Sequence, residues 1–183
     1  PGRGGRNPDA RVLRAKMQEA GLDTLERAMG VSIYMITFGR FLSLPREQID
    51  LLGMLGLLQD VGKLRLPAAL LAKKGPLDET ERELCETHVA HSVAILKEAS
   101  GLPRELPALA ALHHERLDGS GYPLGLKGAQ IGLFGSMAGL IDSFAAFTET
   151  RASGETLARA PAWRGCAATG GGQWAGTWVE PRS

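Results

Sequence analysis

Apolar residues recur at three- and four-residue intervals over most of this chain, and no segment shows the sustained alternation of a β-strand. The first such stretch runs from Arg11 to about Leu44, where Leu25, Met29 and Ile33 are spaced for one helical face. This pattern predicts an all-α domain, folded as a single bundle of about five to seven helices. With 183 residues, 44% of them hydrophobic, the chain is long enough for one such core.

Capping and helix-breaking residues divide the rest of the chain. Further helices are expected over 45–58, 67–71, 78–98, 103–114 and 133–149. Asp78 and Glu81 have the spacing of a capping box at the start of the third of these helices. The Gly-rich stretch 115–130 is predicted to be a structured loop.

The two ends of the chain differ in composition from its middle. Residues 1–10 are rich in Gly, Pro and Arg and are interpreted as a linker or tail. The helical domain is expected to span 11–151. Residues 152–183 hold all three tryptophans but show no helical period, which fits either a disordered tail or a change of reading frame.

Charge and hydropathy exclude several classes of function. A net charge of +1 argues against binding of a nucleic acid polymer, and no apolar run approaches the roughly 20 residues of a membrane span. Two unclustered cysteines, Cys85 and Cys166, form no disulfide framework, so a cytoplasmic location is expected.

A histidine cluster is the main candidate for chemistry. All four histidines of the chain lie close together in sequence: His88, His91, His113 and His114. Asp60 and Asp142 flank them, and imidazoles combined with carboxylates suit Fe, Mn or Zn. Spacing alone leaves a metal site and ordinary helix histidines equally open. His91, one turn from His88, is either a substitute donor or an exposed helix residue.

The loop after the paired histidines is a candidate ligand-binding segment. Its glycines permit close backbone approach, its tyrosine can stack on a ligand, and its arginine can contact an anion. A well-formed surface loop without a ligand would have the same composition.

The string HHERLDGSGYPLGLKG in this loop resembles the signature of the HD-GYP family, which is named for the tripeptide Gly121-Tyr122-Pro123. Similar stretches are QDVGKLRLPAALLAKKGPLDETE, THVAHSVAIL and IDSFAAFT, so the resemblance covers about Asp23 to Arg151. It implies a helical HD-superfamily fold in bacterial signalling. Such domains hold two or three metals, typically Fe or Mn, and hydrolyse cyclic di-GMP to pGpG or GMP.

The resemblance also implies residue roles. Asp60 would be a metal-bridging, catalytic carboxylate, and Lys63 would face the phosphate. The implied metal ligands are Asp60, His88, His113, His114 and Asp142. The implied substrate contacts are Arg116, Asp118, Gly119, Gly121, Tyr122 and Pro123. A metal makes hydroxide available near neutral pH, and two metals can clamp the attacking and leaving oxygens.

Two ligand positions of the family pattern are changed. Gln59 stands where the family has the first histidine of its His-Asp pair, and Arg27 aligns with another histidine ligand. A neutral amide is a poor ligand for a transition metal, and a guanidinium opposes a cation. The sequence therefore predicts one retained metal site and a compromised second one.

Two functions remain open at this stage. One is an active but atypical cyclic di-GMP phosphodiesterase. The other is a catalytically inactive module that binds nucleotide or a partner through the Gly-Tyr-Pro loop, which the family links to GGDEF-type diguanylate cyclases. A different HD-type phosphohydrolase is disfavoured by the intact Gly-Tyr-Pro loop.

Overall fold

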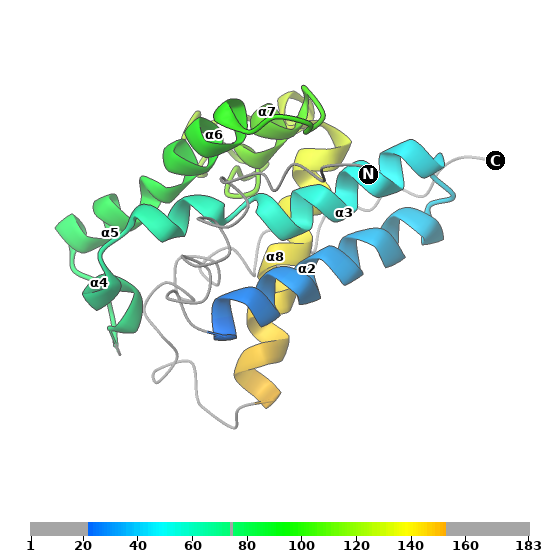
Figure 1. Ribbon diagram of the computed structural model, residues 1–183. Helices are drawn as coiled ribbons and strands as arrows, with labels where there is room; N and C mark the ends of the chain where they lie inside the picture. Colours follow the sequence, from blue (N-terminus) through cyan, green and yellow to red (C-terminus); the bar gives the residue numbers. More distant parts are fainter. Residues whose placement is uncertain (1–21, 74, 153–183) are drawn as a thin grey trace, which may run out of the picture.

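The computed structural model describes residues 22–73 and 75–152, and it confirms the predicted all-α fold (Figure 1). Among these residues the only β-pairing is one isolated bridge, between Asp118 and Lys127. The elements in chain order are α2 (Leu22–Phe41), α3 (Arg46–Leu58), the 3₁₀ segment η1 (Val61–Arg65), α4 (Ala68–Ala72), α5 (Glu79–Glu86), α6 (His88–Glu98), α7 (Leu106–Ala110), the 3₁₀ segment η2 (Gly128–Gln130) and α8 (Gly132–Ala152). The predicted tails, 1–10 and 152–183, lie outside the described residues except for Ala152, which is the last residue of α8.

Helices α2 and α3 form an antiparallel pair in close contact (Figure 1). Glycines make the approach possible, because a Cβ atom on Gly56 would lie 2.7 Å from the Cα atom of Ser32. The Ser32 hydroxyl also donates a 2.8 Å hydrogen bond to the Gly53 carbonyl. The glycines of α3 therefore fix its register against α2.

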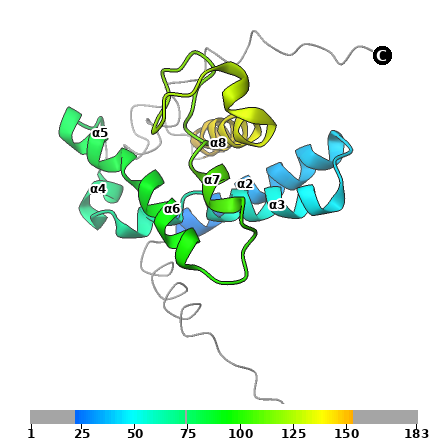
Figure 2. The same cartoon turned by 90° about the horizontal axis from the view of Figure 1, so that it is seen from above.

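The main core lies where α2, α3, α7 and α8 meet. Its fully buried members include Met35, Leu52, Leu55, Leu106 and Ala138. Figure 2 shows α7 between α6 and the α2–α3 pair, while α8, seen nearly end-on, packs against α2, α3 and α7. A second small cluster of Leu66, Leu70 and Cys85 packs α4 against α5. No helix in the described part of the chain has both the length and the apolar character that a membrane span needs.

The helix predicted over 78–98 is present but divided at Thr87. Its start is confirmed, because Asp78 and Glu81 form the expected capping box. At the break, the Thr87 hydroxyl donates to the Leu84 carbonyl at 2.6 Å, and the His88 ring contacts the Cys85 carbonyl. Side chains thus bond to carbonyls that a continuous helix would use for its backbone.

The helix predicted over 103–114 is also shorter in the structure, where α7 ends at Ala110. Tight turns follow it, with the Leu112 amide bonded to the Leu109 carbonyl and the Glu115 amide to the Leu112 carbonyl, each at 3.0 Å. The paired histidines therefore lie in these turns and not on the helix.

Candidate metal centre

The turn between α3 and η1 places Asp60 against α6. Gly62 makes this possible, because its amide donates a 2.8 Å hydrogen bond to the Ser92 hydroxyl and its Cα lies against the α6 backbone. A Cβ atom at this position would be 2.0 Å from the His88 carbonyl oxygen, so only glycine fits. The close contact of η1 with α6 brings the carboxylate of Asp60 to the imidazole of His88.

Two buried histidines are held in a defined tautomer. The Nδ1 atom of His88 lies 2.7 Å from the Cys85 carbonyl oxygen, and the Nδ1 atom of His113 lies 2.7 Å from that of Ala110. A carbonyl oxygen can only accept a hydrogen bond, so each Nδ1 carries the proton. With the proton on Nδ1, the Nε2 atom of each ring can offer a lone pair, as in a metal-binding histidine oriented by a backbone carbonyl.

The Nε2 atoms of His88 and His113 face a common point next to the Asp60 carboxylate. The Nε2 atoms of His88 and His113 are 3.4 Å apart, and the Asp60 Oδ1 atom lies 3.2 Å from the first and 3.5 Å from the second. Three acceptors in contact repel one another unless a cation lies between them. Donors bound at about 2.1 Å to one ion are spaced about 3.0–3.4 Å apart, so the arrangement fits a metal ion.

His114 completes the group of ligand-type residues. One candidate ligand atom from each of Asp60, His88, His113 and His114 lies within 4.8 Å of all the others. Burial, together with the neighbouring imidazoles, holds the pKa of His114 well below its ordinary value, so the ring is neutral and able to coordinate. Its ring stacks on Tyr122, with centroids 4.7 Å apart.

The carboxylate of Asp60 is kept ionised. Burial alone would raise its pKa, but the Lys63 ammonium, 2.7 Å from Oδ2, is the main influence that holds that pKa well below its ordinary value. Burial likewise lowers the pKa of His88, with the Asp60 carboxylate acting in the opposite direction. An ionised Asp60, together with the lowered pKa values of His88 and His114, favours the protonation states that a metal requires.

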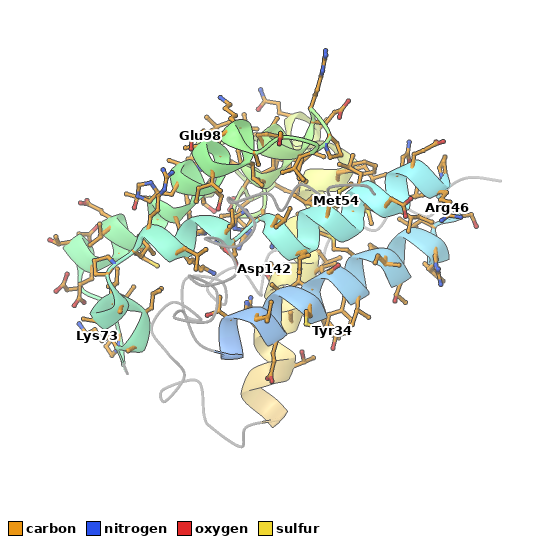
Figure 3. The ribbon with its side chains drawn as sticks, in the orientation of Figure 1. Tyr34, Arg46, Met54, Lys73, Glu98 and Asp142 are labelled. Atoms are coloured by element: carbon orange, nitrogen blue, oxygen red, sulfur yellow. The ribbon has the colours of Figure 1, made fainter. Side chains whose placement is uncertain are left out.

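Asp142, the remaining implied ligand, is not part of this group. Its Oδ1 atom accepts a 2.7 Å hydrogen bond from the guanidinium of Arg27, which also bonds to the Asp142 backbone carbonyl at 3.1 Å. Both side chains are buried, on α8 and α2 respectively. Figure 3 shows Asp142 at the centre of the bundle, where these helices and α3 approach one another.

Gln59, at the other changed position, is buried at 1% exposure on the last turn before Asp60. Neither its amide nitrogen nor its amide oxygen has a hydrogen-bond partner among the described residues. His91, the possible substitute donor, is half-buried and does not join the four-residue group. Around the four ligands, the structure thus offers no second set of metal donors among the described residues.

The Gly-Tyr-Pro loop folds back onto the histidines. Gly121 is required there, because a Cβ atom would lie 2.4 Å from the Arg116 amide nitrogen and 2.5 Å from the His114 carbonyl oxygen. The loop places Tyr122 against His114, while the peptide bond between Tyr122 and Pro123 is cis. Asp118, at the exposed edge, accepts hydrogen bonds from the backbone and hydroxyl of Ser120.

Glu115 organises this loop, a role that the sequence reasoning missed. Its carboxylate is buried and accepts hydrogen bonds from the backbone amides of Leu124 at 2.7 Å and Leu126 at 2.8 Å. An acidic residue directly before a Gly-rich loop was the available signal.

Arg116, predicted to contact substrate, is buried, and its guanidinium donates to the carbonyls of His113 and Glu115. Burial lowers the pKa of Arg116, and the nearby Asp142 carboxylate opposes this effect.

Comparison with known proteins agrees with this geometry. The sequence model of a family described as "HD domain" matches residues 13–168. This chain belongs to the HD domain family. Its relatives named as cyclic di-GMP phosphodiesterases support an HD-GYP-like member of that family.

Three relatives illustrate the similarity. A cyclic di-GMP phosphodiesterase of Pseudomonas aeruginosa is 30% identical over 166 residues, which are 87% of this chain and 40% of that protein. The 3'3'-cGAMP-specific phosphodiesterase 3 of Vibrio cholerae is 38% identical over 54% of this chain and 21% of its own. A cyclic di-GMP phosphodiesterase response regulator of Xanthomonas campestris is 39% identical over 48% of this chain and 23% of its own. This HD domain spans less than half the length of these relatives.

Proposed function

We propose that this HD domain is a cyclic di-GMP signalling module that holds one divalent cation and binds a cyclic dinucleotide at the cation. The observation that carries the proposal is the meeting of three ligand-type atoms, Asp60 Oδ1 and the Nε2 atoms of His88 and His113, within 3.2–3.5 Å of one another. Fe or Mn is the proposed ion, because a mixed set of imidazoles and carboxylate suits these metals.

Charge favours a phosphodiester as the ligand. Around the centre, four carboxylates exceed by one the three cationic side chains of Arg27, Lys63 and Arg116; the carboxylates are those of Asp60, Glu115, Asp118 and Asp142. One bound divalent cation therefore leaves the region positive, which favours an anionic ligand. Lys63 is adjacent to Asp60 and is the proposed contact for a phosphate oxygen.

Phosphodiester hydrolysis by this domain is proposed to be slow. A divalent cation acts as a Lewis acid and lowers the pKa of water, but one ion cannot clamp both the attacking and the leaving oxygens. Backbone carbonyls hold the imidazoles of His88 and His113 in place. We expect these two rings to keep their orientation when the cation and the dinucleotide bind. Tyr122, stacked on His114, is proposed to contact a base of the dinucleotide.

A catalytically inactive binding module is the second candidate. It is favoured by the Arg27–Asp142 ion pair, which occupies two ligand positions of the family pattern. For this second candidate, we propose that the Gly-Tyr-Pro loop contacts a GGDEF-type cyclase. Leu124, an exposed residue of the loop, would lie in the interface. Turnover of bound cyclic dinucleotide separates the two candidates.

The decisive experiment measures metal content, ligand binding and turnover on the same preparation. After anaerobic loading with Fe²⁺ or Mn²⁺, we expect one equivalent per chain by mass spectrometry, and binding of cyclic di-GMP by calorimetry. The His88→Ala variant should lose the cation, whereas the His91→Ala control, one turn away, should keep it. Two tightly bound equivalents with rapid formation of pGpG, or no cation at all, would contradict the proposal. Preference for 3'3'-cGAMP would change the proposed substrate.

Lys63→Met tests the proposed phosphate contact. It should weaken cyclic di-GMP binding by about tenfold, because a point charge near the phosphate is lost, while the cation remains bound. The exposed Lys97→Met variant is the control and should bind as the parent does. Equal affinity in both variants would assign the phosphate contact to another residue.

A further inference from the structure

The Arg27–Asp142 pair is more deeply buried than the other Lys or Arg ion pairs of the described residues, including the Lys63–Asp60 pair of the metal centre. Both side chains are buried, at 4% and 3% exposure, and the guanidinium binds the carboxylate and the backbone carbonyl of the same residue. The Arg46–Asp50 pair, by contrast, is 92% and 63% exposed with a separation of 3.7 Å. A buried charge pair with two directed hydrogen bonds fixes both groups in place.

Helix packing places this pair beside the metal centre. Gly56 of α3 lies against Ser32 of α2 in an antiparallel arrangement. Extending the same register by one turn predicts that the Arg27 turn of α2 lies opposite Gln59 and Asp60 at the end of α3. Asp142 lies close enough to Arg116, in the loop after the paired histidines, to affect the pKa of that residue.

The residues around the pair do not fit a metal ion. A guanidinium has five N–H donors and no lone pair to offer, and the Gln59 amide is a weak donor to a transition metal. The carboxylate of Asp142 already has a full positive charge at 2.7 Å. A second divalent cation here would meet that charge directly, in a buried region where screening by solvent is weak.

We propose that Arg27 is a permanent internal replacement for a second metal ion. Its guanidinium supplies the positive charge that the buried Asp142 carboxylate needs, and it does so without dependence on metal supply. The buried Asp142 carboxylate is therefore neutralised in the folded protein without a bound metal ion. Asp142 acts as the partner of Arg27 and not as a metal ligand in this chain.

Thermal unfolding of the full chain in chelator tests the charge replacement. Arg27→Met removes the positive charge and leaves a buried, unpaired carboxylate, so we expect Tm to fall by about 10 °C. Arg27→Met/Asp142→Asn removes both charges and should regain at least half of that loss. Arg46→Met, which breaks the exposed pair, is the control and should change Tm by less than about 2 °C.

Two outcomes of this unfolding series overturn the proposal. One is an Arg27→Met variant as stable as the parent, and the other is a double variant no more stable than Arg27→Met. If Arg27→Met does not fold at all, recovery of a folded protein in the double variant supports the coupling equally well, and its absence counts against it.

Metal content tests the latent second site. Arg27→His/Gln59→His restores two imidazoles beside Asp60 and Asp142, and should raise the bound Mn²⁺ from one to two equivalents. Adding Asp142→Asn to this variant should return the content to one. A folded double variant that still binds one equivalent would show that Arg27 does not occupy a cation position.

The two arms separate this inference from the proposed function. The unfolding series is run in chelator and does not depend on whether the four-residue centre binds metal or whether cyclic di-GMP is a ligand. Failure of the native chain to bind one cation would contradict the proposed function and leave the Arg27–Asp142 result unaffected.

Discussion

The buried site has two halves, and each contains a carboxylate that needs a positive charge nearby. In the half formed by Asp60, His88 and His113, three ligand-type atoms meet in a way that fits a bound cation. In the half formed by Arg27 and Asp142, the protein's own guanidinium already supplies the positive charge. Lys63 contacts Asp60 at Oδ2 and leaves Oδ1 facing the two imidazoles, whereas Arg27 contacts the Oδ1 atom of Asp142 directly. The comparison shows that a ligand-type carboxylate marks a metal site when a free oxygen faces other ligand atoms, and not merely when it is buried.

The largest effect is expected from removing a ligand in the metal-binding half. His113→Ala deletes one of the two facing imidazoles, and cation affinity should fall by more than about 100-fold, since even groups that only orient ligands are worth 10–100-fold. Calorimetric titration with Mn²⁺ measures this. The matched change in the other half, Arg27→Met/Asp142→Asn, should keep affinity within about threefold. Similar losses in both would erase the distinction between the halves.

Gly62→Ala should affect both stability and metal binding. The added Cβ atom would lie 2.0 Å from the His88 carbonyl, so η1 must move away from α6 and take Asp60 with it. We expect a loss of about 2–3 kcal/mol in the free energy of unfolding and weaker cation binding. Gly30→Ala is the control, because nothing lies within 4 Å of its added Cβ and alanine favours a helix. Urea unfolding in chelator should find Gly30→Ala at least as stable as the parent.

Glu115→Gln should have the smallest of these effects. The carboxylate accepts from the amides of Leu124 and Leu126, and a neutral amide has only one oxygen with which to replace two charge-assisted bonds. A loss of about 1.5–2 kcal/mol in the free energy of unfolding is expected, together with weaker cyclic di-GMP binding through a loosened loop. The exposed Glu83→Gln variant should match the parent within about 0.5 kcal/mol. A stable Glu115→Gln variant with an ordered loop would show that the glycines alone define the loop.

Much of this architecture could be predicted from local sequence patterns. The period of the apolar residues determined the helices, Asp78 and Glu81 determined the start of α5, and the Gly-Tyr-Pro string identified the family. The clustering of histidines between positions 88 and 114 also suggested the metal centre. The helix periods, the capping box and the loop motif depend on interactions within a few residues of one another, which a linear pattern records.

The rest was decided by packing between distant segments. Arg27 and Asp142 are 115 positions apart, so no local pattern could show that they pair. The tautomers of His88 and His113 depend on carbonyls freed where helices break, and the approach of Asp60 depends on Gly62 fitting against α6. The sequence by itself determined which residues were available as ligands. Only the tertiary structure decided that Asp60, His88 and His113 face a common point, and that Asp142 is paired with the buried guanidinium of Arg27.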